Sequence, residues 1–382
     1  MKILVTGANG FIGKNLVAEL RNQGYCDLYL FDIDQTREQL KRYTQDCAFV
    51  FHLAGVNRPK HESEYMQGNL GLTGQLLELL KENGNRAPLL MSSSIQAELC
   101  NPYGNSKKAA EELLFSYERE TGIPVFIYRL PNVFGKWCRP NYNSVVATFC
   151  DHIAHGQPIT IHAADTLLRL VYIDDVISSF LAAMKGEICR DRAFCKVPVE
   201  YYASVGDLAR RLYLFHDQRQ SLNLPAVSDP FEKALYSTYL SYLPENGFCY
   251  PVKMHSDDRG SFTELIKTAG SGQFSVNITK PGITKGNHWH HTKCEKFIVV
   301  SGTAVIRLRR IGTGEILTYQ VSGAQIEVVD IPPGYTHAII NTGDTELITF
   351  MWANEIYDPS HPDTYYEPVE QEANGSEKPQ EL

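Results

Sequence analysis

The sequence predicts an α/β domain followed by an all-β domain, and three observations lead to this fold class. From residue 1 to about 245, short apolar runs of strand type alternate with segments of helical spacing, which predicts a parallel sheet with helices on both faces. Beyond the Tyr- and Pro-rich stretch 235–251, closely spaced β-rich runs, several separated by Gly or Pro, indicate a small barrel or sandwich. The length of 382 residues is enough for two separate cores.

Each expected element follows from its local pattern. In the first domain we expect strands at 3–5, 28–31, 49–53, 88–91 and 125–128, and helices over 15–22 and 72–81. In the second domain we expect strands at 273–278, 296–300, 304–308, 317–321, 326–331 and 347–352. The domains are therefore placed at 1–245 and 246–369. Residues 370–382 have almost nothing to bury, and we expect them to be disordered.

Composition narrows the class of protein. A hydrophobic content of 43% and a charged content of 21% are ordinary for a soluble globular protein. The net charge of −8, without a Lys/Arg block, argues against a nucleic-acid or membrane-surface partner. The nine scattered cysteines form no C-x-x-C pair and indicate reduced thiols in a cytoplasmic protein. No apolar stretch is long enough for a signal peptide or a membrane span.

A glycine-rich loop lies between the first strand and the first expected helix. Its glycines allow a tight turn and a close approach of the backbone to a pyrophosphate, and the helix N-terminus offers free N–H groups. Such a motif alone is weak evidence, but strand, loop and helix follow here in the required order. We therefore expect a nicotinamide dinucleotide to contact Gly7, Asn9, Gly10, Phe11, Ile12 and Gly13.

Two residues bear on the choice of nicotinamide cofactor. Asp32 closes the second strand about twenty residues further on, where an acidic residue binds the ribose 2′-hydroxyl of NAD. Arg37 is near enough in the sequence to bind the 2′-phosphate of NADP instead. Asp32 can equally serve as a helix or turn cap, so the choice between the two cofactors stays open.

A tyrosine and a lysine four residues apart form a candidate acid–base pair. Tyr103 and Lys107 precede the helical run 109–114, so their side chains share one helix face. A free tyrosine has a pKa near about 10, and a lysine cation stabilises its phenolate and moves that pKa toward neutrality. The serine run 92–94 follows the strand that ends at residue 91, and one of its hydroxyls can hold the reacting carbonyl oxygen.

The second domain carries a candidate metal site. Alternate residues of a strand face one side, so His288 and His290 can both point into a barrel, whereas His291 points away. Glu295 opens the next strand, and His337 follows the run Pro-Pro-Gly-Tyr-Thr. Three imidazoles and one carboxylate suit zinc, iron, manganese, nickel or copper and leave positions open for water or substrate.

The first domain resembles the extended short-chain dehydrogenase/reductases. The resemblance rests on the glycine loop, the run 52–55, the serine run, the Tyr103/Lys107 pair and the run 129–135. It implies a doubly wound Rossmann domain acting mainly on nucleotide sugars, in which Ser94 completes a triad with the tyrosine and the lysine. It also implies that Asn132 lies beside the nicotinamide, and it extends the cofactor contacts to Leu53, Ala54 and Gly55.

Two further residues lie near the motifs of that family. Arg169 is about one residue out of register with the family's phosphate-binding arginine, and it is left unassigned. Asp175 is expected to cap or pack locally rather than to catalyse.

The second domain resembles the cupins through both of their motifs, which implies a cupin β-barrel. The runs 257–264 and 285–288 are also similar to sugar epimerases that act on 4-keto-6-deoxy sugars. In those enzymes the histidine that matches His288 is the general base, usually without a metal. Their acid tyrosine would fall near Met351, where this chain has no tyrosine. Metal polarisation of the substrate could replace the missing acid.

The chain up to about residue 369 resembles the CapF-type capsule-synthesis enzymes, through runs that include 136–144 and 236–244. The resemblance implies synthesis of UDP-2-acetamido-2,6-dideoxy-L-talose on the route to UDP-N-acetyl-L-fucosamine. The cupin would epimerise C3 of a UDP-linked 4-keto-6-deoxy amino sugar, with His288 or Glu295 as the base. The reductase domain would reduce C4 with NADP(H). We also expect one divalent metal, with zinc first among the candidates, and a homodimer.

Two alternatives stay open. The first is a nucleotide-sugar epimerase or dehydratase that retains its NAD, with the cupin as a structural module. A dehydratase needs an Asp-Glu pair beside the serine, and the run Ser93-Ser94-Ile95-Gln96 has none. The second alternative is a non-enzymatic, NADP-sensing regulator, a class that commonly loses the catalytic Tyr and Lys. This chain keeps both residues.

Overall fold

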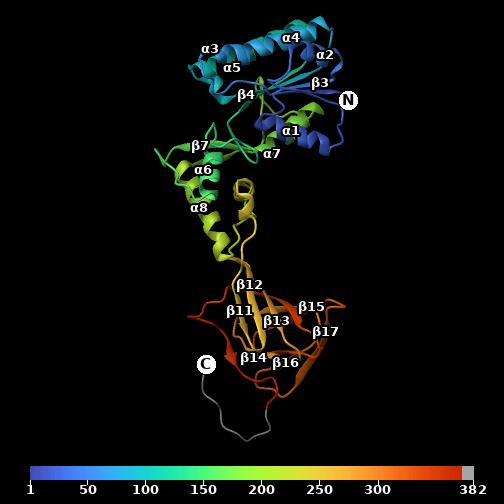
Figure 1. Ribbon diagram of the computed structural model, residues 1–382, viewed down its shortest axis with the longest axis vertical. Coiled ribbons are helices and arrows are strands. Elements are labelled where there is room, and N and C mark those ends of the chain that lie inside the picture. The colour runs from blue at the N-terminus through green and yellow to red at the C-terminus, as the bar shows by residue number, and fades with distance from the viewer. Residues whose placement is uncertain (372–382) are drawn as a thin grey trace. The chain divides into compact units, whose positions relative to one another are not determined.

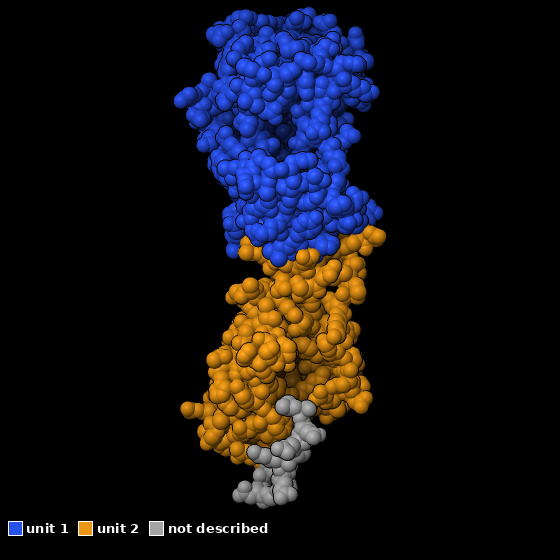
Figure 2. Space-filling view, turned by 90° about the vertical axis from the view of Figure 1, so that its left-hand side faces the viewer, with its two compact units in different colours: residues 1–216, 227–245 blue, residues 217–226, 246–382 orange. Residues whose placement is uncertain are grey.

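The computed structural model describes residues 1–371 of the chain. Two compact units are formed, one by 1–216 with 227–245 and the other by 217–226 with the described residues from Asn246 on (Figure 2). The expected tail 370–382 lies outside the described residues, apart from Glu370 and Gln371. Among the helices of the described residues, none is long and apolar enough to span a membrane.

The first unit contains a seven-stranded sheet in the order β2-β1-β3-β4-β5-β9-β8. Figure 1 labels β3 and β4 of this sheet. Its strands are β1 (Ile3–Thr6), β2 (Leu28–Phe31), β3 (Phe49–His52), β4 (Leu89–Ser94), β5 (Val125–Leu130), β8 (Arg190–Asp191) and β9 (Phe194–Cys195). All neighbouring strands are parallel except β8 and β9. The chain goes from β1 to β2 on one side and to β3 on the other, so the order reverses between β1 and β3. Ligands of open α/β sheets bind at such a switch point, beyond the carboxyl ends of the strands.

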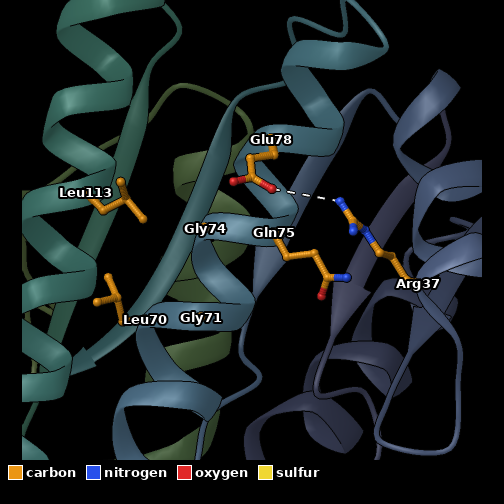
Figure 3. A pocket seen from close by; sticks show the side chains of 7 residues that line it. All are labelled: Arg37, Leu70, Gly71, Gly74, Gln75, Glu78 and Leu113. Atoms are coloured by element: carbon orange, nitrogen blue, oxygen red, sulfur yellow. Dashed lines mark ion pairs between the residues drawn. The ribbon is translucent and has the colours of Figure 1, made fainter.

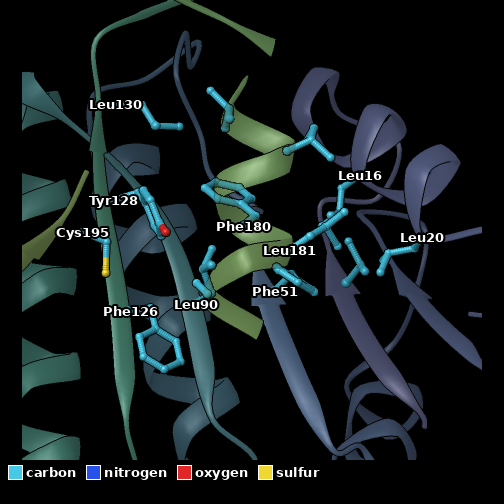
Figure 4. Close-up of a cluster of buried hydrophobic side chains, with 14 of the residues drawn as sticks. Leu16, Leu20, Phe51, Leu90, Phe126, Tyr128, Leu130, Phe180, Leu181 and Cys195 are labelled. Atoms are coloured by element: carbon cyan, nitrogen blue, oxygen red, sulfur yellow. The ribbon is translucent and has the colours of Figure 1, made fainter. Parts of the chain in front are cut away.

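Helices cover both faces of this sheet, because its strands are apolar on both sides. The covering helices are α1 (Phe11–Asn22), α2 (Arg37–Asp46), α4 (Leu72–Glu82), α5 (Pro102–Thr121) and α7 (Ile173–Met184). The shorter α3 (Ser63–Tyr65), π-helix η1 (Met66–Gly71) and 3-10 helix η2 (Ile95–Glu98) lie in the connections. Phe51 and Leu90 meet Leu16 of α1 and Phe180 of α7 on one face (Figure 4). On the other face, alternate residues of the same strands meet α2, α4 and α5.

Helix α5 carries the candidate acid–base pair, and its sequence defines both of its ends. The side chain of Asn101 accepts a hydrogen bond from the Gly104 N–H at 2.7 Å, and Pro102 fills the first helical position. The helix ends at Gly122, which has φ of 68° and therefore adopts the left-handed conformation that glycine tolerates best. A fixed N-terminus holds Tyr103, in the first turn, at a defined place.

A small sheet and three helices complete the first unit. The sheet has the order β10-β7-β6, with β6 (Asn132–Phe134), β7 (Leu167–Tyr172) and β10 (Tyr201–Ser204). It shares a core with α6 (Val145–Ala154), α8 (Val205–Ser221) and α9 (Pro230–Leu240). The last residues of α8, from Asp217 on, belong to the second unit.

The second unit consists of two antiparallel sheets, as expected for a cupin-like barrel. One has the order β11-β12-β13-β20-β15-β18 and the other β17-β16-β19-β14-β21. Their bounds are β11 (Met254–Asp257), β12 (Gly260–Thr268), β13 (Gly272–Thr279), β14 (Thr284–Trp289), β15 (Glu295–Ser301), β16 (Thr303–Arg310), β17 (Ile316–Ser322), β18 (Val328–Ile331), β19 (Tyr335–Asn341), β20 (Leu347–Ala353) and β21 (Tyr365–Tyr366), and the 3-10 helix η3 (Glu245–Gly247) precedes them.

Candidate functional site

The glycine loop lies at the switch point of the parallel sheet, between β1 and α1. Gly7 has φ of 70°, and a Cβ placed on it would lie 2.6 Å from the backbone nitrogen of Ala54. A Cβ on Gly13 would lie 2.1 Å from the carbonyl oxygen of Gly7. Both positions therefore require glycine, so that the loop can pack against the chain after β3 and α1 can approach β1. This close-packed backbone is what a dinucleotide pyrophosphate needs, and the residues present fit that group.

The two residues that bear on the cofactor turn to different partners. The Asp32 carboxylate accepts hydrogen bonds from the N–H groups of Asn9, at 2.7 Å, and Ile33, at 2.8 Å. It therefore ties the glycine loop to the end of β2. Arg37 points toward Glu78 of α4, with 3.9 Å between the charged atoms (Figure 3). Arg37 and Glu78 both line a shallow hollow on the outer side of α4. The other residues that line it are Leu70, Gly71, Gly74, Gln75 and Leu113.

Tyr103 and Lys107 lie on one face of α5. The ammonium of Lys107 is 6.0 Å from the centre of the Tyr103 ring and donates a hydrogen bond to the Ser92 carbonyl at 3.4 Å. Burial raises the pKa of the Tyr103 hydroxyl, and its hydrogen bond with Ser94 opposes that rise. Burial lowers the pKa of Lys107 to about 8. The structure therefore brings the three predicted triad residues together at the end of β4.

The space around Lys107 depends on two residues, Gly55 and Asn69. A Cβ on Gly55 would lie 2.9 Å from the Lys107 ammonium and 2.7 Å from the Asn69 side-chain oxygen. Asn69 is buried in the π-helix η1, accepts from the Val56 N–H at 3.0 Å and donates to the Ser106 hydroxyl at 2.9 Å. No motif in the sequence points to Asn69. Single-turn π-helices concentrate at functional sites, but they leave no clear periodicity in a sequence.

A buried ion pair supports the same helix. Glu111 is one turn beyond Lys107, and Arg129 of β5 approaches its carboxylate with two nitrogens, at 2.6 and 3.0 Å. The Ser93 hydroxyl donates to the same carboxylate. The Glu111 charge opposes the lowering of the Lys107 pKa. The serine run, α5 and β5 are thus held together by one carboxylate.

The remaining residues named from the sequence have local partners. The Asn132 amide donates to the Arg169 carbonyl at 3.2 Å, which links β6 to β7. The Arg169 guanidinium pairs with Glu200 through two contacts of 2.7 Å. Burial raises the pKa of Asp175, and one of its carboxylate oxygens is buried without a hydrogen-bond partner. The Asp175 carboxylate also has a hydrogen bond with the Tyr201 side chain of β10.

In the second unit, the side chains of His288, His290, Glu295 and His337 converge inside the barrel. Their ligand atoms all lie within 4.8 Å of one another. One Glu295 oxygen is 3.4 Å from His290 Nε2 and 3.3 Å from His337 Nε2. These three atoms are buried without a hydrogen-bond partner. His291 points to the outside, where its ring meets Trp289 and Tyr365, as the strand alternation predicts.

The electrostatics of this cluster fit a bound cation. Burial lowers the pKa of His288 to about 4, which keeps its imidazole neutral near pH 7. Burial alone would raise the pKa of Glu295, but the neighbouring His290 and His337 outweigh burial and lower it. An ionised carboxylate thus faces imidazole nitrogens in a buried space. Three nitrogen donors and one oxygen donor suit a divalent first-row transition metal.

A bulge in β14 brings the histidines into position. The register of β14 with β19 shifts between Gly286 and His288, and Asn287 has φ of 61°. A Cβ on Gly286 would lie 2.6 Å from the His337 carbonyl oxygen, so glycine is required there. The bulge places His288 directly across from His337. Phe297 is the next residue of β15 after Glu295 that faces inward, and Met351 of β20 pairs with Phe297.

Comparisons with known proteins agree with this geometry. The model of the NAD dependent epimerase/dehydratase family matches residues 3–188. The model of the polysaccharide biosynthesis C-terminal domain matches residues 255–365. The first match contains the glycine loop and the Tyr103–Lys107 pair, and the second contains the His/Glu cluster.

Relatives match nearly the whole chain. UDP-2-acetamido-2,6-beta-L-arabino-hexul-4-ose reductase of Pseudomonas aeruginosa is 48% identical over 365 residues, which are 96% of this chain and 98% of the relative. The crystal structure of the capsular polysaccharide assembling protein CapF of Staphylococcus aureus is 49% identical with a TM-score of 0.92, covering 97% of this chain and 100% of that one. A structure of CapF with the inhibitor 3-isopropenyl-tropolone is 46% identical with a TM-score of 0.87 over the same shares.

The parallel sheet with its Tyr103–Lys107 pair defines an NAD(P)-dependent oxidoreductase of the epimerase/dehydratase type, here joined to a cupin-like unit. Within that class, the chain belongs to the family of the Pseudomonas hexulose reductase and CapF. The predicted fold class is thereby confirmed for both units.

Proposed function

We propose that this chain is a bifunctional nucleotide-sugar enzyme of capsule or O-antigen synthesis. Its cupin-like unit epimerises C3 of a UDP-linked 4-keto-6-deoxy amino sugar, and its first unit reduces the C4 ketone. The product is UDP-2-acetamido-2,6-dideoxy-L-talose, a precursor of UDP-N-acetyl-L-fucosamine. The observation that carries the proposal is that one chain holds both a Tyr–Lys reductase pair and a buried His/Glu cluster, and that its near full-length relative is named as a reductase of a UDP-linked hexulose.

In the reduction, the nicotinamide supplies a hydride when it is bound. Tyr103 donates its phenolic proton to the C4 oxygen as the ketone becomes an alcohol. Lys107 stabilises the phenolate that remains, since its ammonium lies 6.0 Å from the ring centre. Ser94, which hydrogen-bonds Tyr103, holds the same carbonyl oxygen. Atoms balance, because one hydride and one proton add across the C=O bond.

In the epimerisation, the C3–H bond is acidic because the adjacent ketone takes up the charge of the enolate. His288 is the candidate base, because it alone among the four cluster residues is not fully buried. It removes the C3 proton, and a proton returns to the opposite face, so the step needs no oxidant. A divalent metal held by His290, Glu295 and His337, zinc first among the candidates, would supply Lewis acidity toward the ketone oxygen and would leave the lone pair of His288 free to accept the proton. That acidity suits a site where Met351 occupies the position of an acid tyrosine.

An inhibitor of the relative has the chemistry of a metal ligand. The CapF structure is described with 3-isopropenyl-tropolone. A tropolone carries adjacent oxo and hydroxyl oxygens, which form a bidentate donor pair for a divalent cation. We expect this compound to compete with the keto sugar for binding to this protein. We expect the competition to be lost when the metal is removed.

The test separates the two steps. Tyr103→Phe protein is incubated with the 4-keto sugar in D2O without nicotinamide, and deuterium is expected at C3 with no reduction. The matched variant His337→Ala is expected to lose C3 exchange while still reducing a substrate that is already epimerised. A folded, metal-loaded Tyr103→Phe protein that leaves C3 unexchanged would count against the cupin as the epimerase. Failure of the wild-type protein to convert the sugar with either NADH or NADPH would refute the reductase.

Three properties accompany the proposal. NADPH is the expected reductant, and parallel assays with NADH decide the preference. A homodimer is expected from the family resemblance and is tested by analytical ultracentrifugation. The supply of reduced nicotinamide and the nine free cysteines support a cytoplasmic location.

A further inference from the structure

A segment that follows β20 binds the loop that carries the second histidine of the cluster. We define the C-terminal strap as residues 362–369. It contains β21, which pairs antiparallel with β14, with His288 opposite Tyr366 and Trp289 opposite Tyr365. It also receives the buried Arg309 side chain, which donates to the carbonyls of Val369 and Pro368, each at 2.9 Å. The strap is therefore anchored along its length.

One residue of the strap, Asp363, makes contacts with four consecutive residues. Its carboxylate accepts hydrogen bonds from the backbone N–H groups of His291, Thr292 and Lys293, each at 2.9 Å. The same carboxylate accepts from the Thr292 hydroxyl at 3.0 Å. The carbonyl oxygen of Asp363 lies 2.5 Å from Nδ1 of His290. Lys293, in return, donates to Thr364 at 3.0 Å. No other carboxylate in the described structure receives three consecutive backbone N–H groups.

The contact with His290 determines which nitrogen of that ring carries the proton. A carbonyl oxygen can only accept a hydrogen bond, so Nδ1 of His290 must be the donor. A neutral imidazole protonated on Nδ1 presents a bare lone pair at Nε2. That Nε2 atom is buried, lacks a hydrogen-bond partner and lies 3.4 Å from the Glu295 carboxylate. Two electron-rich atoms at this distance repel each other unless a cation lies between them.

The backbone of Asp363 is held in a conformation suited to this double role. Its φ is 37°, in the left-handed region that Asp and Asn enter more readily than other non-glycine residues. The side chain and the carbonyl of Asp363 can thereby both face the loop after β14. The carboxylate fixes the loop, and the carbonyl fixes the ring.

We propose that Asp363 is the positioning residue of the metal site: it clamps the 291–293 loop and orients His290 so that Nε2 faces the cation. The inference rests on the metal half of the proposed function. Groups that orient metal-bound histidines alter metal affinity by about 10- to 100-fold when they are removed. Asp363 itself does not touch the metal or the substrate.

The experiment uses the full chain, stripped of metal, and titrates it with Zn²⁺ against a chromophoric chelator. Asp363→Gly keeps the positive-φ backbone and removes the carboxylate, and a 10- to 100-fold loss of Zn²⁺ affinity is expected. Asp363→Asn, which retains one acceptor oxygen, is expected to lie between this variant and wild type. The matched control Asp358→Gly removes an exposed carboxylate five positions earlier, and wild-type affinity is expected.

A second readout separates positioning from general stability. In ¹⁵N–¹H spectra of the metal-free protein, wild-type His290 is expected to be protonated on Nδ1, and Asp363→Gly is expected to mix the two tautomers. The proposal is overturned if a folded Asp363→Gly protein binds Zn²⁺ with wild-type affinity, or if its affinity falls only in proportion to the unfolded fraction. If Asp363→Gly does not fold, Asp363→Asn decides by the same criteria. Wild-type protein that binds no Zn²⁺ refutes the metal site instead.

Discussion

The Lys107 ammonium lies 6.0 Å from the centre of the Tyr103 ring while being fully enclosed by protein. The enclosure has an energetic cost, because a buried cation loses its hydration. The candidate acid–base pair therefore also lowers the stability of the fold, and this relationship yields the first prediction.

Lys107→Met is expected to raise stability at neutral pH while abolishing reduction. The pKa of Lys107 is lowered from 10.5 to about 8, so burial of the charge costs on the order of 3 kcal/mol below pH 8. Between pH 8 and 10.5 the unfolded chain holds the proton and the native chain does not, so wild-type stability rises with pH. The advantage of the variant should therefore shrink over that window. Denaturant unfolding at pH 7 and pH 10 measures it; an equal difference at both values would contradict the assignment.

The reduction rate is expected to fall as pH rises through about 8, because Lys107 then loses the charge that stabilises the Tyr103 phenolate. Single-turnover hydride transfer, followed by nicotinamide absorbance at saturating sugar, measures the profile. C3 exchange by the Tyr103→Phe protein serves as the control, because it does not depend on Lys107 and should not show this limb.

Gly55→Ala is expected to impair reduction strongly. The added methyl would lie 2.9 Å from the Lys107 ammonium and 2.7 Å from Asn69 Oδ1, so the lysine must shift. Gly74→Ala is the matched control, because its methyl would meet nothing closer than 3.7 Å within a helix. Gly74→Ala should leave turnover unchanged and stabilise the protein by about 0.5–1 kcal/mol. Steady-state assays and thermal unfolding distinguish the two outcomes.

Glu111→Ala is expected to destabilise the first unit by about 1–3 kcal/mol, because Arg129 loses its buried partner but keeps the exposed partner Glu98 at 2.9 Å. Glu120→Ala, which breaks the exposed pair with Lys81, should cost less than about 1 kcal/mol. Urea unfolding of the two variants provides the comparison. Equal losses of stability in the two variants would show that the Glu111 carboxylate is exposed to solvent.

Removal of a bound metal is expected to lower the thermal stability of the second unit, because a ligand that binds only the native state stabilises it. Zn²⁺ at about 1,000 times its Kd should add about 4 kcal/mol to wild-type stability. His337→Ala should remove this increment, since its imidazole is buried in the cluster. The exposed His361→Ala is the control. Calorimetry with and without a chelator records the difference.

The features that the sequence predicted well are those with a local signature. The glycine loop follows a strand and precedes a helix, and a spacing of four puts Tyr103 and Lys107 on one helix face. Alternation along a strand predicted that His288 and His290 face one way and His291 the other. Periodicity of this kind depends on neighbouring residues alone, so a single sequence contains it. The helix over 15–22 and the strand over 88–91 were found for the same reason, although the structure extends them to Phe11 and Ser94.

The features that the sequence did not predict depend on partners far along the chain. Strand β14 contains Gly286 and Asn287, both weak strand formers, and its bulge is required only because His337 passes close by. Asn69 acts through Val56 and Ser106, which local spacing does not connect. Residues 217–226 belong to the second unit although the expected boundary lay at 245.

The position of the strap in the chain has a consequence for biosynthesis. Asp363 lies 73 residues beyond His290, almost at the end of the described chain. The first unit can fold while the ribosome is still working, since domains usually fold in order from the N-terminus. The histidine loop of the second unit, in contrast, receives its last hydrogen bonds only after Asp363 has been synthesised. Metal capture would then follow the folding of the first unit, and a chain cut before Asp363 would hold a cation poorly.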